Sequence, residues 1–161
     1  MIRNAVASDL DRLYEIEVSC FPKEEAASKQ SLNERFQIFP ENFLVMEENQ
    51  NIIGFINGSF TDAEAVCDAF YHDAALHQES GSNACVFGIS IIEEYRGRGL
   101  GSALLEAFCA MAKHKHKKAV ILTCKEKYIP FYEHCGFICL GISSSSHGNA
   151  VWYDMIYRIK A

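Results

Sequence analysis

The sequence predicts one domain of the mixed α/β class, with a twisted central sheet of six to seven strands and about four helices around it. Strand and helix signals alternate only in the second half of the chain, while two helices precede a hairpin in the first half. This order is typical of a single mixed sheet and differs from a doubly wound nucleotide fold. The chain has 161 residues, and 49% of them are hydrophobic. This is enough to form the hydrophobic core of one stable domain, residues 1–161.

The first helix follows a short strand at residues 2–6. Ser8 begins the helix, Asp11 gives it a near capping box, and Pro22 ends it. The helix face that we expect on the core is formed by residues at helical spacing, namely Leu10, Leu13, Ile16 and Glu17.

A second helix and a hairpin complete the first half. The helix begins at Ser31 and is stopped by Pro40. Strands at residues 43–48 and 52–60 follow, and the polar turn at 49–51 between them predicts a hairpin.

The second half begins with a segment that has no regular period. Residues 61–82 mix acids, aromatics and polar side chains, and we expect a mobile loop there with one helical turn. The elements predicted after it are a strand at 83–92, a helix at about 99–114, a strand at 119–124, a short helix at 129–135, and strands at 137–142 and 150–159. The serine-rich segment 143–149 predicts a flexible hairpin loop.

The composition argues against several classes of function. A net charge of −6 disfavours a nucleic-acid surface, and the basic run KHKHKK at 113–118 is explained by its place at a helix C-terminus. Seven cysteines without a CxxC pair predict no metal site, and we expect most of them to be reduced and buried. The N-terminal residues lack an apolar signal core, and no apolar stretch is long enough to span a membrane. We therefore expect a cytoplasmic protein without a membrane segment.

The stretch EEYRGRGLGSALLEAF at residues 93–108 places two arginines and three glycines before a long helix. A helix N-terminus offers free N–H groups and a positive dipole end, and glycine lets a ligand approach the backbone closely. Arg96 and Arg98 add positive charge suited to phosphate oxygens. The turn therefore predicts a pyrophosphate site, although a turn of this kind also occurs for packing alone. The patterns of a P-loop and of a dinucleotide fingerprint do not fit.

Two motifs resemble the GNAT superfamily of N-acetyltransferases. The first is Arg96-x-x-Gly99-x-Gly101, which follows the strand VFGISII, and the second is YIPFYEHCGF, which follows the strand VILTC. The segment CFPKEEAASKQSLNERFQIFPENFLV is similar to arylalkylamine and polyamine N-acetyltransferases. The resemblance implies the GNAT fold and acetyl-CoA as the cosubstrate.

The resemblance also implies where the coenzyme lies. The turn amides hold its pyrophosphate, and the preceding strand lines its pantetheine arm. The residues that it assigns to this role are Ile89, Ser90, Ile91, Glu93, Arg96, Gly97, Arg98, Gly99, Leu100, Gly101, Ser102 and Tyr132. Glu93 departs from the family, in which many members have proline at this position.

Acetyl transfer from a thioester to an amine needs a proton donor for the thiolate and a base for the amine. Tyr132 matches the family tyrosine near the sulfur, and a phenol can donate that proton; packing beside Phe131 is the alternative. Arylalkylamine transferases carry two histidines on the strand before the glycine turn, at the positions where this chain has Cys85 and Phe87. Glu24 or Glu25 is the replacement that we expect, although such a pair often only begins a helix.

Two aromatic regions allow a further interpretation. An amine pocket under the mobile loop is one hypothesis, and ordinary surface composition explains the same residues equally well. Its members are Phe60, Phe70, Tyr71 and His72, with acids at 62, 64, 68 and 73. Trp152 and Tyr153 are expected in the core or at an oligomer edge.

The sequence thus predicts an acetyl-CoA-dependent N-acetyltransferase that acts on a small amine of the arylalkylamine or polyamine type through a ternary complex. A protein or peptide N-acetyltransferase of the same fold is one alternative. A non-catalytic acyl-CoA-binding module is another, because the histidine pair is missing. A homodimer remains an option for its assembly.

Overall fold

Seven strands form one sheet at the centre of the protein, in the order β1-β2-β3-β4-β5-β7-β6. The computed structural model describes residues 1–160, and Ala161 lies outside them. The strands are β1 Ile2–Asn4, β2 Phe43–Glu48, β3 Asn51–Thr61, β4 Asn83–Ile91, β5 Ala119–Cys124, β6 Ile138–Ile142 and β7 Tyr153–Arg158. β4 and β5 are parallel and the other neighbours are antiparallel, which confirms the predicted mixed sheet.

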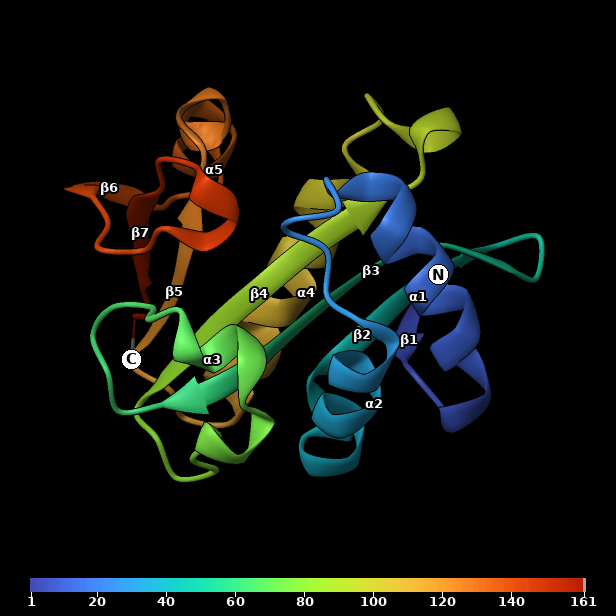
Figure 1. Cartoon of the computed structure of the whole chain (residues 1–161), viewed down its shortest axis with the longest axis horizontal. Helices are drawn as coiled ribbons and strands as arrows, with labels where there is room; N and C mark the ends of the chain where they lie inside the picture. Colours follow the sequence, from blue (N-terminus) through green and yellow to red (C-terminus); the bar gives the residue numbers. More distant parts are fainter. Residues whose placement is uncertain (161) are drawn as a thin grey trace.

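Helices cover both faces of this sheet. They are α1 Leu10–Cys20, α2 Lys29–Ile38, the single turn α3 Ala69–His72, α4 Leu100–His114 and α5 Ile129–His134. Figure 1 shows α4 behind β4, and α1 and α2 on the near side of β2 and β3. Successive residues of β2 therefore enter different cores: Leu44 packs in the core that contains α4, and Val45 packs in the core that contains α1 and α2.

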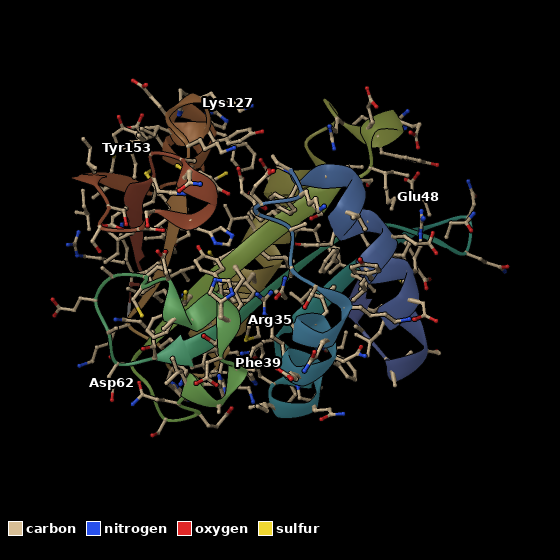
Figure 2. All side chains as sticks on the ribbon, viewed as in Figure 1. Arg35, Phe39, Glu48, Asp62, Lys127 and Tyr153 are labelled. Atoms are coloured by element: carbon tan, nitrogen blue, oxygen red, sulfur yellow. The ribbon has the colours of Figure 1, made fainter. Side chains whose placement is uncertain are left out.

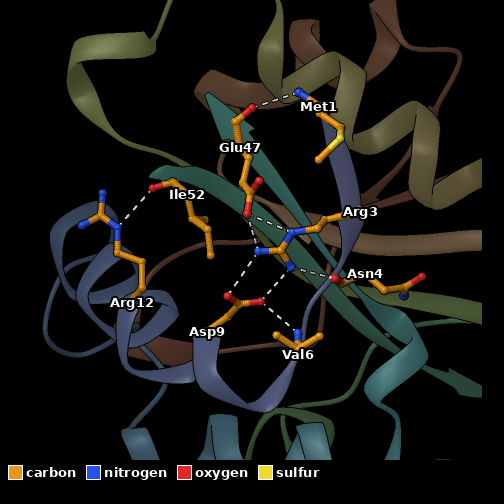
Figure 3. Close-up of polar contacts among 8 residues, drawn as sticks. All are labelled: Met1, Arg3, Asn4, Val6, Asp9, Arg12, Glu47 and Ile52. Carbon is orange, nitrogen blue, oxygen red and sulfur yellow. Dashed lines mark hydrogen bonds and ion pairs between the residues drawn. The ribbon is translucent and has the colours of Figure 1, made fainter. Parts of the chain in front are cut away.

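A polar cluster fixes the start of the chain (Figure 3). The Arg3 guanidinium pairs with Asp9 at 2.8 Å, and its Nε donates to Glu47 at 2.9 Å. The Val6 N–H donates to Asp9 at 2.8 Å. This ion pair holds the pKa of Asp9 below its usual value. The cluster joins β1, the first turn before α1, and β2.

Two helix starts differ from the prediction by two residues each. A 3-10 turn at Ala7–Asp9 precedes α1, which therefore begins at Leu10 and not at Ser8. α2 begins at Lys29, since the Ser28 side chain accepts the Ser31 N–H at 3.0 Å. The residue expected to begin the helix is thus inside its first turn.

The loop predictions had different outcomes. Residues 61–82 contain the expected single turn, α3, and a further 3-10 turn at Ala74–Leu76. The hairpin loop at 143–149 is not the flexible loop that we predicted, because Ser143 and Ser145 are buried. The Ser145 hydroxyl and the Ser146 N–H both donate to the Asp68 carboxylate, and this anchors the loop.

β4 and β5 separate beyond their first three residue pairs, which run from Asn83–Ala119 to Cys85–Ile121. Figure 1 shows the two strands diverging. A bulge in β4 places Phe87 between residues paired with Gly58 and Asn57 of β3. The β4 backbone beyond Cys85 therefore has no strand partner on the β5 side, which leaves its polar groups available to a ligand.

Candidate active site

One cavity of about 960 Å³ lies where β4 and β5 diverge. We call one part the glycine-turn half, lined by residues of 88–102 and 123–132. We call the other the three-segment half. It is lined by residues of the segments 20–28, 71–72 and 147–152, together with Glu17, Arg35, Asn57 and Phe87. The cavity thus joins the predicted pyrophosphate turn to a second chamber.

The glycine turn has the backbone geometry that an anion site needs. Gly97 and Gly99 have φ values of +79° and +77°, with no atom within 4 Å of the place where a Cβ would stand. Gly99 directly precedes α4, whose first-turn N–H groups point out of the helix without intrahelical partners. The 15-residue helix adds its positive dipole end.

Most of the residues predicted to bind coenzyme line this cavity. Those that line it are Ile89, Ser90, Ile91, Arg96, Gly97, Gly99, Leu100, Gly101, Ser102 and Tyr132. Glu93 and Arg98 are exposed and lie outside the lining. Arg98 stacks on the Tyr95 ring at 4.9 Å, and the Arg96 Nε donates to the Ile91 carbonyl at 2.8 Å. The Arg96 side chain therefore binds the last carbonyl of β4 and also lines the cavity.

Tyr132 of α5 lines the glycine-turn half of the cavity. Its ring packs between Phe131 and Phe137, with centroid distances of 5.0 and 5.8 Å. Burial raises the pKa of its hydroxyl well above the ordinary value for tyrosine, so the phenol stays protonated and can donate. The Tyr132 ring thus also packs beside Phe131, as the alternative prediction required. This packing orients the ring and leaves it in the cavity lining.

The two carboxylates predicted as bases lie differently. Glu24 is exposed and outside the cavity lining. Glu25 lines the cavity, but its carboxylate pairs with Lys125 at 2.7 Å, and its side chain is 8% exposed. This pair connects the segment before α2 with the end of β5. Glu25 therefore links the two sides of the opening and is already neutralised.

Glu17 of α1 is a site residue that the sequence reasoning placed only on the core face of a helix. It is 6% exposed and lines the cavity, and one carboxylate oxygen accepts the Ala27 N–H at 2.9 Å. Burial raises its pKa, against a smaller opposite effect of the Arg35 charge. The available signal was a carboxylate among Leu13 and Ile16 on an apolar helix face.

Arg35 of α2 is a second site residue that the sequence reasoning missed. Figure 2 shows it in the middle of the molecule, near α2 and β4. It is 4% exposed, lines the cavity, and donates to the Asn57 amide oxygen at 3.0 Å and to the Tyr71 carbonyl at 2.9 Å. The guanidinium lies over the Phe87 ring at 4.5 Å. Burial lowers its pKa, so its charge is held at a cost in desolvation.

Aromatic rings from distant segments form a wall of the three-segment half. Tyr71 stacks on His147 with centroids 4.9 Å apart, and its hydroxyl shares a 2.9 Å hydrogen bond with Thr123. The His147 Nε2 lies 3.1 Å from the Glu25 carbonyl, and the Trp152 indole donates to the His147 carbonyl at 2.7 Å. These contacts join the three segments to one another.

The cavity lining can be compared with the aromatic residues that were predicted to form an amine pocket. Tyr71 and His72 line the cavity, as the amine-pocket hypothesis required, whereas Phe60 is buried in the α4 core. Phe70 packs with the small core around Val66. Trp152 was expected in the core or at an oligomer edge, and it lines the cavity instead because its indole reaches the His147 loop.

The cysteines are free, but the expectation that most are buried is wrong. Cys85 and Cys124 are buried, Cys67 is exposed, and the other four are half-buried. Cys85 takes the place of a family histidine, and burial raises its pKa far above the ordinary value, so it is not a base. Across residues 1–160 no cluster of three or more potential metal ligands occurs. Within the same residues, no helix has the length and apolar character needed to cross a bilayer.

Comparison with known proteins defines the class. The profile of the Acetyltransferase (GNAT) family matches residues 10–137, and the chain belongs to this family. It is 26% identical to serotonin N-acetyltransferase of Mesocricetus auratus over 117 residues, which are 72% of this chain and 55% of that protein. A 43-residue stretch is 49% identical to glucosamine 6-phosphate N-acetyltransferase of Trypanosoma brucei brucei, covering 27% of this chain and 29% of that protein. The chain thus spans about half of the first relative and under a third of the second.

Solved structures confirm the fold. The GphF GNAT-like decarboxylase in complex with isobutyryl-CoA superimposes with a TM-score of 0.86 and 22% identity, over 99% of this chain and 100% of that chain. At this level of identity the likeness concerns the fold. The predicted GNAT architecture is therefore confirmed, and the activity must be argued from the cavity.

Proposed function

We propose that the chain is an acetyl-CoA-dependent N-acetyltransferase that acts on a primary amine of a small molecule through a ternary complex. The observation that supports this most strongly is the single cavity that runs from the glycine turn, along the open edge of β4, to a chamber containing a buried carboxylate. Both substrates can therefore meet without an acyl-enzyme, and holding them together supplies much of the rate.

The glycine-turn half fits acetyl-CoA. The N–H groups around Gly99 and Leu100 suit the pyrophosphate oxygens, and the β4 backbone beyond Cys85, which has no strand partner on the β5 side, suits the pantetheine amides. Glu93 and Arg98, which the resemblance also assigned to the coenzyme, have a weaker case because they lie outside the cavity lining. No metal is part of the proposal.

The proposed chemistry needs two proton transfers. The amine nitrogen attacks the thioester carbonyl carbon, and the carbon–sulfur bond then breaks. Glu17, whose second oxygen is free of protein hydrogen bonds, takes the proton that the amine loses. Tyr132 hydrogen-bonds the leaving thiolate and gives it a proton, which the phenolate then recovers from solvent. Glu25 remains a candidate base only when its ion pair with Lys125 opens, and Glu24 has no path from outside the cavity.

A small acceptor fits this chamber better than a peptide. The segments that contain Glu25, Tyr71 and His147 contact one another beside the cavity, and this packing favours a compact acceptor over an extended chain. A polyamine is disfavoured as well, because Glu25 is paired with Lys125, which leaves Glu17 as the one cavity-lining carboxylate without an ion pair among residues 1–160. The aromatic wall favours an acceptor with an aromatic side chain, of the arylalkylamine kind.

The test is thiol release from acetyl-CoA with a panel of arylalkylamines, polyamines and N-terminal peptides. We expect turnover of aromatic amines and a fall of about 100-fold or more in kcat for Tyr132→Phe. Tyr153→Phe, a conservative change outside the cavity lining, is the control and should keep its activity. Faster turnover of peptides would favour the protein acetyltransferase. Tight acetyl-CoA binding without turnover of any amine would favour the non-catalytic binding module.

A further inference from the structure

Two buried groups of opposite charge in the three-segment half form no direct ion pair, although each lies within range of the other's charge. Glu17 is 6% exposed and Arg35 is 4% exposed, and neither forms an ion pair among residues 1–160. Burying a charge without an ion pair is unfavourable unless hydrogen bonds or a counter-charge offset the lost hydration. Both side chains line the same cavity, so a ligand is able to supply what the protein does not.

The hydrogen bonds of Arg35 leave donors free. A guanidinium has five N–H groups, and Arg35 uses two of them, on the Asn57 amide oxygen and the Tyr71 carbonyl. Both acceptors are neutral, and the Phe87 ring offsets the charge only in part. The remaining donors suit a planar anion such as a carboxylate, which guanidinium binds through two parallel hydrogen bonds.

Glu17 provides the complementary end. One oxygen is held by the Ala27 N–H, which fixes the carboxylate, and the other is free of protein hydrogen bonds. An amine beside this oxygen would be attracted and could lose its proton to it. Since the positive and negative groups line one cavity, a ligand that carries both an amine and a carboxylate can contact both of them.

We infer that the acceptor is a zwitterion, an amino acid with an aromatic side chain, whose amine faces Glu17 and whose carboxylate binds Arg35. The inference rests on the proposed function and deepens it. Tyr71, His147 and Trp152 would contact the aromatic side chain. Only the amino acid has a carboxylate that can pair with Arg35. This contact should make it a better acceptor than the arylalkylamine with the same side chain.

The test compares matched acceptors by thiol release, tryptophan against tryptamine and phenylalanine against phenethylamine. We expect kcat/KM to be at least about 10-fold higher for the carboxylated member of each pair. Asn57→Asp, which is nearly isosteric, places a carboxylate on Arg35 and should abolish this preference. Asn42→Asp is the matched control. It is a buried asparagine outside the cavity whose amide nitrogen has no protein partner, and the variant should keep the preference.

Several outcomes overturn the inference. A preference for tryptamine, or an unchanged ratio in Asn57→Asp, would show that no carboxylate binds Arg35. If malonyl-CoA gains an advantage over acetyl-CoA with tryptamine, and Asn57→Asp removes it, the carboxylate belongs to the acyl group instead. Turnover of no amine at all contradicts the proposed function itself. In that case calorimetry of tryptophan with CoA present still tests the inference, which the absence of tryptophan binding would overturn.

Discussion

The two halves of the cavity are built from different parts of the polypeptide. The glycine-turn half is lined mainly by one continuous segment, residues 88–102, with residues of 123–132 beside it. The three-segment half is lined by residues of α1, α2, α3, β3 and β4 and of two loops, which are far apart in sequence. A backbone site depends on a few glycines and a helix start, whereas a side-chain site depends on how distant segments pack. The two halves should therefore respond to different substitutions.

The largest effect is expected in the three-segment half. Glu17→Gln keeps an oxygen for the Ala27 N–H but removes the base, so kcat should fall about 100-fold or more while acetyl-CoA affinity stays unchanged. Glu24→Gln is the matched control outside the cavity and should be fully active. In the wild type, burial raises the Glu17 pKa. The acidic limb of the pH–rate profile should accordingly lie above the ordinary glutamate value of about 4.3.

Two results would contradict this assignment. Full activity of Glu17→Gln would show that Glu17 is not the base. Loss of acetyl-CoA binding in the same variant would show that the two halves are not separable. Steady-state kinetics and calorimetry on one preparation distinguish these cases.

The next effect belongs to the glycine-turn half. Gly99→Val places a β-branched residue at φ +77°, which costs about 1–2 kcal/mol and moves the N–H groups ahead of α4. Acetyl-CoA should bind about 10-fold more weakly by calorimetry. Gly141→Val in β6, at φ +109°, is the control: it should lower the free energy of unfolding without changing the affinity. Equal loss of affinity in both variants would indicate a general effect of strain.

A smaller effect is expected at the contact that joins the halves. Lys125→Met breaks the 2.7 Å pair with Glu25 and loosens the segment before α2. The KM for the acceptor should rise a few-fold, while acetyl-CoA affinity remains the same. A double-mutant cycle with Glu25→Gln should give a coupling energy of about 1 kcal/mol. Lys115→Met breaks an exposed pair with Glu41 and should leave both constants unchanged. Additive effects of Lys125→Met and Glu25→Gln would show that the pair does not act as a unit.

The smallest effect is expected outside both halves, at the N-terminal cluster. Arg3 lowers the pKa of Asp9, so the ionised carboxylate stabilises the folded state. This contribution is fully present above about pH 4, the unfolded value for aspartate, and is lost as the pH falls through the lower folded pKa. Asp9→Asn should lower the free energy of unfolding by about 1 kcal/mol at pH 7 and by almost nothing near pH 2, measured by urea denaturation. A difference that does not depend on pH would assign the effect to packing.

The same contrast explains what the sequence could predict. The glycine turn, Tyr132 and the strand before α4 are local motifs, and the mixed sheet follows from the order of strand and helix signals. Glu17 and Arg35 could not be assigned, because a charged residue on a helix face is ordinary until the packing shows it to be buried. The loop around His147 was misread for a related reason. Its serines are typical of a flexible turn, and the contacts that hold it in place come from the distant Asp68, Glu25 and Tyr71.

The most direct test of the account is a crystal structure with CoA and an aromatic acceptor bound together. The account predicts pyrophosphate oxygens on the N–H groups around Gly99, the sulfur beside Tyr132, and the acceptor nitrogen within hydrogen-bond distance of Glu17. Coenzyme bound away from the glycine turn, or an acceptor outside the opening between β4 and β5, would contradict it.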